Sequence, residues 1–259
     1  MKTKTTILTA LIAATILMGA CKTHHYQVTS VERSRILIDS RYDAHPDQQA
    51  TEFLKPYKQK VDSVMSPVVG CSAKYMTAVR PEGTLSNLLS DIMVWGAKNY
   101  DEKPDFGVYN IGGVRAALPK GDVTYGDILD IAPFENKIAF ATLKGSEVME
   151  LFSQIASVEG EGVSSSVRLV ITKSGDLLSA TINGKPVDPN CDYRLATIDY
   201  LLGGTDKMEA LKKCHSINAP KETSSNSRFI IMDYFREMAK QGKEVDANIE
   251  GRITVVDNQ

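Results

Sequence analysis

Three short segments of the chain combine residue types that could together hold a small polar ligand. The first reads Asn110-Ile111-Gly112-Gly113-Val114-Arg115 and continues a β-rich run that starts at residue 105. Paired glycines allow positive φ angles and a close approach of the backbone to a ligand. An arginine can fork onto a phosphate or a carboxylate. Taken alone, the segment is also typical of a bend followed by a surface salt bridge.

The second segment, Pro133-Phe134-Glu135-Asn136, carries an aromatic ring and a side-chain amide close together in a loop. The ring of Phe134 could stack on a nucleobase. The amide of Asn136 could form hydrogen bonds with the edge of that base. The alternative interpretation is a loop phenylalanine that packs into the core.

The third segment, Tyr200-Leu201-Leu202-Gly203-Gly204-Thr205-Asp206, follows another β-rich run. Its tyrosine and aspartate could present a ring and a carboxylate to a sugar. The alternative is a Gly-Gly turn before a helix that is capped by Thr205 or Asp206.

Apolar spacing predicts the helices around these segments. Leu85, Leu88, Leu89, Ile92 and Met93 recur at helical spacing after Thr84, which is a suitable N-cap. Further helices are expected over residues 47–65 (with Pro56 inside), 124–131, 145–156 and 228–240, and in the segment after Gly204.

Runs of β-branched and aromatic residues predict the strands. They cover residues 31–38, 68–79, 105–111, 137–143, 167–172, 177–182, 193–200 and 253–256. Asn183-Gly184 marks a tight hairpin turn. Because helices and strands alternate irregularly, with hairpins in the second half, we expect an α+β domain, that is, a mixed sheet with flanking helices.

The first twenty residues resemble a signal peptide of the lipoprotein type. Lys2 and Lys4 precede an apolar run from residue 7 to 18, which is too short to span a bilayer, and small residues lead to Cys21. We therefore expect residues 1–20 to be a signal peptide, residues 21–46 a polar tether, and residues 47–259 the folded domain. Lipidation of Cys21 would make the chain an exported, membrane-anchored lipoprotein of the bacterial cell envelope; the alternative is plain secretion.

Taken together, the three segments are far more specific than any one alone. Their order resembles the C-terminal domain of 5′-nucleotidases and UDP-sugar hydrolases. Thr124-Tyr125-Gly126-Asp127, the helix that contains Leu85-Ser86-Asn87-Leu88, and Lys144-Gly145 fit further motifs of that family. The resemblance extends from about residue 47 to 256.

The resemblance implies a nucleotide pocket. In the family, two rings sandwich the base, and these positions are Phe134 and Tyr200 here. Asn136 falls where an asparagine meets the base, Asp206 near the ribose-binding aspartate, and Arg115 on the phosphate side. The substrate-binding set predicted in this way is Arg80, Asn110, Gly112, Gly113, Arg115, Phe134, Asn136, Tyr200, Gly203, Gly204 and Asp206.

Two departures from the family pattern bear on specificity. The usual Gly-Gly-Asp-Gly-Tyr is replaced by Gly203-Gly204-Thr205-Asp206-Lys207, and the extra residue puts the ribose contact in question. Residues 162–166 replace a segment that lines the pocket in relatives, so base preference could differ.

Hydrolysis in this family belongs to a separate two-metal metallophosphatase domain. The four histidines here are His24, His25, His45 and His215. Asp43-Ala44-His45 spells the D-x-H motif of that domain, but it lies in the polar tether and the domain's other metal-binding motifs do not follow it. Cys214 and His215 are neighbours on an expected helix end, so their side chains diverge and a nucleophile–base pair is not expected. We predict no catalytic residue, metal site or cofactor in this chain, and expect divalent metals only in a partner metallophosphatase.

These observations leave three hypotheses. In the first, the chain is the nucleotide- or nucleoside-binding part of a 5′-nucleotidase-type phosphohydrolase system, inactive alone, whose metallophosphatase is a separate chain. In the second, it is a stand-alone nucleotide- or nucleoside-binding lipoprotein without catalysis. In the third, it is a remnant whose pocket no longer binds. A net charge of −2 gives no electrostatic reason to expect nucleic acid as a partner.

Overall fold

The computed structural model describes residues 26–257, in two compact units that divide between Phe53 and Leu54. The expected signal peptide and Cys21 lie outside the described residues. In the first unit, the strand expected over residues 31–38 is absent, and the short helix η1 (Ser40–Tyr42) follows instead. No helix in the described range is long and apolar enough to cross a membrane. The expected domain boundary at residue 47 stays a prediction.

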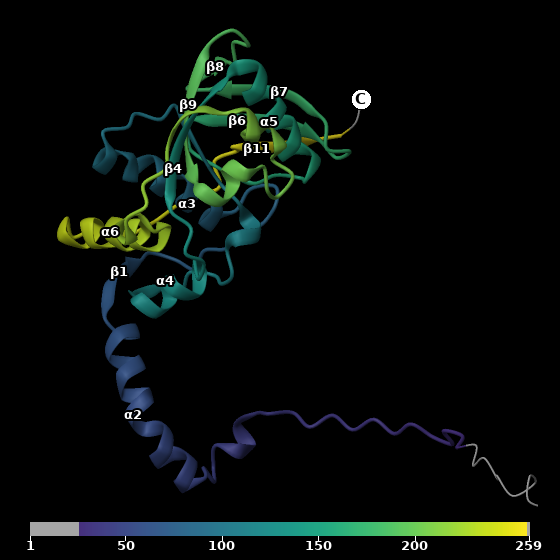
Figure 1. Ribbon diagram of the computed structural model, residues 1–259, viewed down its shortest axis with the longest axis vertical. Coiled ribbons are helices and arrows are strands. Elements are labelled where there is room, and N and C mark those ends of the chain that lie inside the picture. Colours follow the sequence, from purple (N-terminus) through teal and green to yellow (C-terminus); the bar gives the residue numbers. More distant parts are fainter. Residues whose placement is uncertain (1–25, 258–259) are drawn as a thin grey trace, which may run out of the picture. The chain divides into compact units, whose positions relative to one another are not determined.

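The elements of the chain are shown in Figure 1. The α-helices are α2 (Gln48–Met65), α3 (Thr84–Gly96), α4 (Tyr125–Ile131), α5 (Gly145–Ser157) and α6 (Ser227–Lys240). The strands are β1 (Val68–Ser72), β2 (Phe106–Tyr109), β3 (Gly121–Thr124), β4 (Ile138–Lys144), β5 (Gly162–Val163), β6 (Val167–Thr172), β7 (Leu177–Ile182), β8 (Lys185–Pro186), β9 (Asp192–Ile198), β10 (His215–Asn218) and β11 (Ile253–Val256).

The second unit contains the mixed sheets that the sequence predicted. The largest has the strand order β10-β4-β9-β2-β5, with β2 and β9 parallel and the other neighbours antiparallel. A second sheet has the order β11-β6-β7-β8, with β11 parallel to β6. The turn between β7 and β8 places Asn183 and Gly184 at φ angles of 52° and 73°, as an Asn-Gly hairpin turn requires.

Helices α3 and α5 carry the hydrophobic core. Every apolar position that predicted α3 is buried, and this helix packs on β2, β5 and β9. Helix α5 packs on strands of both larger sheets. The rings of Phe106 in β2 and Phe152 in α5 meet edge to face, with centroids 5.6 Å apart.

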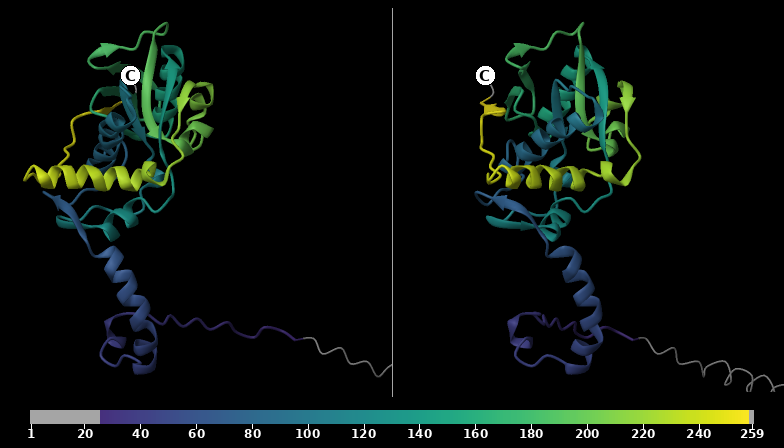
Figure 2. Two further views of the ribbon diagram at one scale, coloured as in Figure 1. Left: turned by 60° about the vertical axis from the view of Figure 1, so that its left-hand side comes forward. Right: turned by 90° about the vertical axis from the view of Figure 1, so that its left-hand side faces the viewer.

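Helices α4 and α6 pack against a third, two-stranded sheet formed by β1 and β3. Thr124 and Asp127 form the capping box that starts α4: the Asp127 N–H donates to Thr124 Oγ1 (3.2 Å), and the Thr124 N–H donates to Asp127 Oδ2 (2.7 Å). Helix α6 lies beside β1 and packs on α3 and α4 (Figure 2).

Arg252, directly before β11, is the largest fully buried side chain of the described residues. Its guanidinium donates to the carbonyl of Val163 (2.8 Å) and to Asp91 Oδ2 (2.7 Å). Its backbone N–H donates to Glu82 Oε2 (3.0 Å). The charge of Arg252 is paired with Asp91, and all three neighbours accept hydrogen bonds from Arg252. The arginine therefore anchors β11 to the core.

Several expected boundaries differ from those observed. The strand expected to end at residue 79 ends at Ser72, and beyond it the only described bridge before α3 joins Met76 to Leu118. Thr84 is the first residue of α3 rather than its cap, because its hydroxyl accepts from the Thr77 N–H (3.3 Å). The helix expected after Gly204 is the short 3₁₀ helix η5 (Glu209–Lys213), and His215 lies in β10.

The three cysteines within the described range, Cys71, Cys191 and Cys214, are all free thiols.

Candidate ligand-binding pocket

The three sequence segments meet because of how the central strands run. Strands β2 and β9 are parallel, so their carboxyl ends lie at the same edge of the sheet. Strand β4 runs antiparallel to β9, and Ile138 at its start pairs with Ile198 at the end of β9. The segments after β2, before β4 and after β9 therefore converge. This edge of the sheet is a frequent position for ligand sites in α/β folds.

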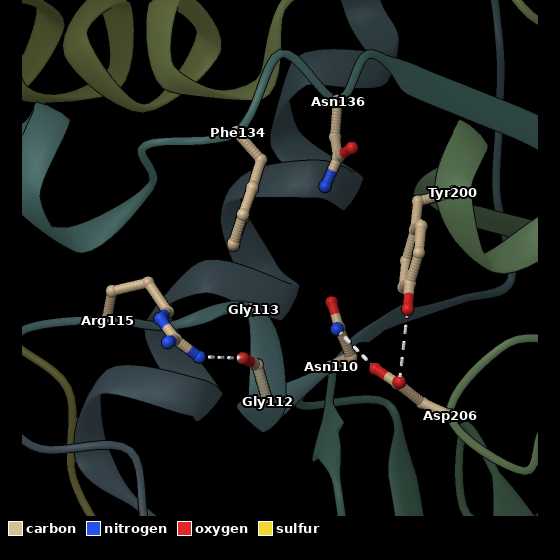
Figure 3. A pocket seen from close by; sticks show the side chains of 8 residues that line it. All are labelled: Asn110, Gly112, Gly113, Arg115, Phe134, Asn136, Tyr200 and Asp206. Atoms are coloured by element: carbon tan, nitrogen blue, oxygen red, sulfur yellow. Dashed lines mark hydrogen bonds between the residues drawn. The ribbon is translucent and has the colours of Figure 1, made fainter. Parts of the chain in front are cut away.

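Phe134 and Tyr200 face each other across a cavity of about 290 Å³ (Figure 3). Both rings are half-exposed, at 46% and 43%. Asn136 projects into the space between them from the same loop as Phe134. Two half-exposed rings on opposite sides of a cavity leave a slot open to a flat ligand.

The loop that carries Phe134 and Asn136 is held from behind by the start of α6. The Ser227 N–H donates to the Asn136 carbonyl (2.8 Å), and Arg228 Nη2 donates to the Phe134 carbonyl (3.2 Å). On the other side of the cavity, the Lys137 N–H donates to Asp199 Oδ1 (3.0 Å), next to Tyr200. The backbones that carry both rings are thus fixed, whereas the rings themselves remain exposed.

The floor of the cavity is a buried polar network. Asn110, 2% exposed, donates through Nδ2 to Asp206 Oδ2 (2.5 Å). The hydroxyl of Tyr200 donates to Asp206 Oδ1 (3.3 Å). Among the described residues, Asn110 Oδ1 is the one buried side-chain acceptor without a hydrogen-bond partner, and it points toward the space between the rings (Figure 3). A buried unpaired acceptor is costly, so this oxygen is suited to accept from a ligand.

The two glycines of the first segment do not adopt the positive φ angles that the sequence led us to expect. Neither Gly112 nor Gly113 has a positive φ angle, so backbone freedom is not the reason for them. A Cβ on Gly113 would lie 2.8 Å from Asn110 Oδ1. The glycine is therefore needed to make room for the asparagine.

Arg115 lies at the mouth of the cavity. Its Nη1 donates to the Gly112 carbonyl (3.3 Å), and its guanidinium carbon is 6.0 Å from the centroid of the Phe134 ring. Within the described residues no ion pair engages this guanidinium. Its charge is therefore available to an anionic group of a ligand that reaches past Phe134.

The third segment forms a tight turn that aims Asp206 at the cavity. Gly204 has a φ angle of 72°, and the Thr205 hydroxyl donates to the Tyr200 carbonyl (2.8 Å). Asp206 and Lys207 both have left-handed φ angles, 52° and 64°. Two consecutive non-glycine residues in this region are uncommon and are typical of functional turns.

The structure brings eight of the eleven predicted residues together around this one cavity. Gly203 and Gly204 shape the turn behind it, and Arg80 lines an adjoining cavity. Residues 162–166 are not among the lining residues; the Ser164 hydroxyl instead accepts from the Gly107 N–H (2.8 Å). That these residues bind a substrate stays a prediction.

Sequence reasoning missed Glu161, which is 3% exposed and lines the adjoining cavity. Its Oε2 accepts from the Ile111 N–H (2.5 Å), and its Oε1 pairs with Arg80. Burial raises the pKa of Glu161, and this effect outweighs the opposing ones of the Ile111 N–H and Arg80. The one local signal is that glycines flank it on both sides.

No group of three or more histidine, cysteine or acidic side chains between residues 26 and 257 is placed to hold a metal ion. The described residues therefore do not fit the two-metal centre of a metallophosphatase.

An open slot between two rings, a polar floor and an unpaired arginine are the features that small-ligand sites share. Residues 68–213, more than half of the chain, match the family described as 5′-nucleotidase, C-terminal domain, and the chain belongs to this family.

Individual relatives agree with this assignment. The chain is 31% identical over 216 residues to the silent protein UshA(0) of Salmonella typhimurium, a match that covers 82% of this chain and 38% of that protein. It is 24% identical to the 5′-nucleotidase of Vibrio cholerae, over 84% of this chain and 38% of that protein. The crystal structure of the 5′-nucleotidase precursor from Thermus thermophilus superimposes with a TM-score of 0.69 at 26% identity, covering 82% of this chain and 44% of that one. The chain thus spans less than half the length of these relatives.

Proposed function

We propose that this domain binds a nucleotide or nucleoside, as the substrate-binding part of a 5′-nucleotidase-type phosphohydrolase system. The observation that carries the proposal is the pair of half-exposed rings, Phe134 and Tyr200, facing each other above a buried polar floor. An aromatic slot suits a nucleobase because every base has a flat π-face, and stacking contributes ~1–3 kcal/mol per base.

The other lining residues suit the other parts of such a ligand. The Asn136 amide lies where it could meet the edge of the base. Asp206 and the unpaired Oδ1 of Asn110 are acceptors for sugar hydroxyls. Arg115, at the mouth, suits the phosphate. In this arrangement the domain orients the ligand, and a hydroxyl of the ligand donates a hydrogen bond to Asn110 Oδ1, the unpaired acceptor of the floor.

Hydrolysis in this proposal comes from a metallophosphatase that holds the divalent metals and acts on the phosphate presented by this domain. We expect that partner to be a separate chain in the cell envelope. The family assignment supports the proposal.

The binding claim is tested by calorimetric titration of the purified chain with AMP, adenosine, UMP and UDP-glucose. We expect saturable binding of at least one of them, lost in Phe134→Ala. A matched control is Tyr75→Ala, which removes a ring that is 65% exposed and lies outside the cavity. Equal binding by both variants, or no binding by the unmodified chain, would contradict the proposal.

The partner claim needs a second experiment. The chain is mixed with a metallophosphatase domain from the same organism, and hydrolysis of the bound nucleotide is followed with Mg²⁺ or Mn²⁺ present. We expect co-elution and a faster turnover that Phe134→Ala reduces. Tight nucleotide binding with neither co-elution nor a change in turnover would favour the stand-alone binding lipoprotein instead.

We also propose that the chain is exported and lipid-anchored through Cys21, on the strength of the sequence pattern of residues 1–21. Mass spectrometry of the mature N-terminal peptide is the test. An acylated Cys21 at the new N-terminus supports anchoring, and an unmodified N-terminus that starts elsewhere contradicts it.

A further inference from the structure

A second cavity, also of about 290 Å³, adjoins the proposed base slot. The two cavities share Gly112 and Asp206 as lining residues. A ligand that occupies the slot could therefore extend past Gly112 into the second cavity. Its other lining residues are Arg80, Val158, Glu161 and Lys207.

Glu161 is held in this cavity by its backbone. A Cβ on Gly160 would lie 2.4 Å from the Pro81 carbonyl oxygen, and one on Gly162 would lie 2.6 Å from the Tyr109 carbonyl oxygen. The segment therefore fits between its neighbours only because glycine flanks the glutamate on each side. The side chain has no freedom to swing into solvent, since it is 2% exposed.

The carboxylate of Glu161 joins two parts of the site. One oxygen accepts from the Ile111 N–H at the start of the Gly112-Gly113 turn (2.5 Å), and the other pairs with Arg80. The same carboxylate also feels the negative charge of Asp206. Two cations, Arg80 and Lys207, and two carboxylates, Glu161 and Asp206, thus line one small space, and their formal charges cancel.

Building on the proposed function, we propose that Glu161 is a positioning residue that determines specificity at this site. It fixes the start of the Gly112-Gly113 turn and offsets the charge of Arg80, so that the second cavity gives a phosphate little net attraction. Recognition of phosphate then depends mainly on Arg115, and the second cavity suits an uncharged, hydroxyl-bearing part of the ligand.

Loss of a buried carboxylate usually weakens a site, but here we expect loss of the Glu161 charge to strengthen the binding of a phosphorylated ligand. Glu161→Gln keeps an oxygen that can accept from the Ile111 N–H, but it removes the charge that offsets Arg80. Binding of a phosphorylated ligand should therefore strengthen relative to the matching nucleoside. At the distances across so small a cavity we expect a change of about 3- to 10-fold in this ratio.

The experiment measures the dissociation constants of adenosine and AMP, and of uridine and UMP, for the full chain by calorimetry. The quantity compared is the nucleotide-to-nucleoside affinity ratio, which a general loss of packing would not shift in favour of the nucleotide. Glu159→Gln is the matched control. It removes the same charge from a residue two positions before Glu161, and the side chain of Glu159 lines a different cavity. We expect a raised ratio in Glu161→Gln and an unchanged ratio in Glu159→Gln.

Arg80→Gln supplies an independent arm. It leaves Glu161 uncompensated, so the ratio should fall by about 3-fold or more, and the double variant Arg80→Gln/Glu161→Gln should return it toward the original value. An unchanged ratio in Arg80→Gln, or an unchanged or lower one in a folded Glu161→Gln, overturns the inference while leaving the proposed function intact. Absence of binding by the unmodified chain would overturn both.

Discussion

The two sides of the pocket are built in opposite ways. The rings of Phe134 and Tyr200 are nearly half exposed, and only their backbones are held in place. Asn110 in the floor and Glu161 in the adjoining cavity are almost wholly buried and bonded to residues far away in the chain. We therefore expect the rings to affect binding with little effect on the fold, and the floor to affect both.

The largest effect is expected at the floor. Asn110→Ala removes the donor to Asp206 and the one orphaned acceptor, so the affinity for nucleoside should fall by at least ~tenfold, or ~1.4 kcal/mol. The free energy of unfolding should also fall, by ~1 kcal/mol. Calorimetry and urea unfolding measure the two quantities, with Asn190→Ala on an exposed turn as the control. Lost affinity at unchanged stability would show that the floor is not the structural side of the pocket.

Phe134→Ala should give the complementary result. We expect a loss of ~1–3 kcal/mol in binding free energy because one stacking surface is removed. The free energy of unfolding should stay within ~0.5 kcal/mol, since the side chain is half-exposed. Thermal and chemical unfolding without ligand provide the check; a clear loss of stability would mean that this ring belongs to the core after all.

Tyr200→Phe separates the contribution of the Tyr200 ring to binding from that of its hydroxyl, which contacts the polar floor. The ring remains, and only the 3.3 Å contact with Asp206 is lost. Affinity should therefore fall by no more than ~0.5–1.5 kcal/mol, less than in Phe134→Ala. A loss as large as that of Phe134→Ala would assign Tyr200 to the polar floor.

The smallest effect is a change in pH dependence. Burial raises the pKa of Glu161 above its ordinary value of 4.5, so the folded state binds more protons than the unfolded state just above that pH. Stability should therefore decrease as pH rises from 4.5 through the raised pKa, and Glu161→Gln should remove this decrease.

Glu102 has a pKa that is shifted in the opposite direction from that of Glu161, and the same unfolding measurement tests both. Hydrogen bonds from Arg194 lower its pKa. Its contribution to stability is therefore present above the ordinary pKa and is lost as pH falls through the lowered one. Urea unfolding over a pH range that extends well below and well above 4.5 should show the two variants, Glu161→Gln and Glu102→Gln, changing the pH slope in opposite directions. Equal slopes in both would contradict the pKa shifts.

The sequence predicted the two rings and the buried Asn110 as lining residues, but it missed Glu161. Phe134, Asn136 and Tyr200 stand in short segments next to strands, and the order of these segments resembles the family, so together they predicted one pocket where each alone did not. Glu161 depends on Ile111 and Arg80, which are 50 and 81 residues away, and no local pattern reveals such partners. The sequence shows the paired glycines, but the reason for Gly113, which is room for Asn110, is visible only in three dimensions.

The fold shows the same division. The apolar spacing of α3 predicted a helix because every turn of this helix places an apolar residue on its buried face. The β-rich run after Val68 predicted too long a strand, since propensity does not say where a partner strand stops. Residues 31–38 have strand-like composition but no partner strand among the described residues, and pairing rather than composition makes a strand.

Arg252 has a consequence for the order in which this domain folds. Its acceptors Asp91 and Glu82 precede it by 161 and 170 residues, so the contacts that fasten β11 have a very high sequence separation. Such contacts close late, because the loop entropy must be lost before they form. Until then, Asp91 Oδ2 and Glu82 Oε2 lack the donors that Arg252 supplies, and β6 presents an unpaired edge. In that state the open edge of β6 is the part of the molecule most exposed to association with another chain.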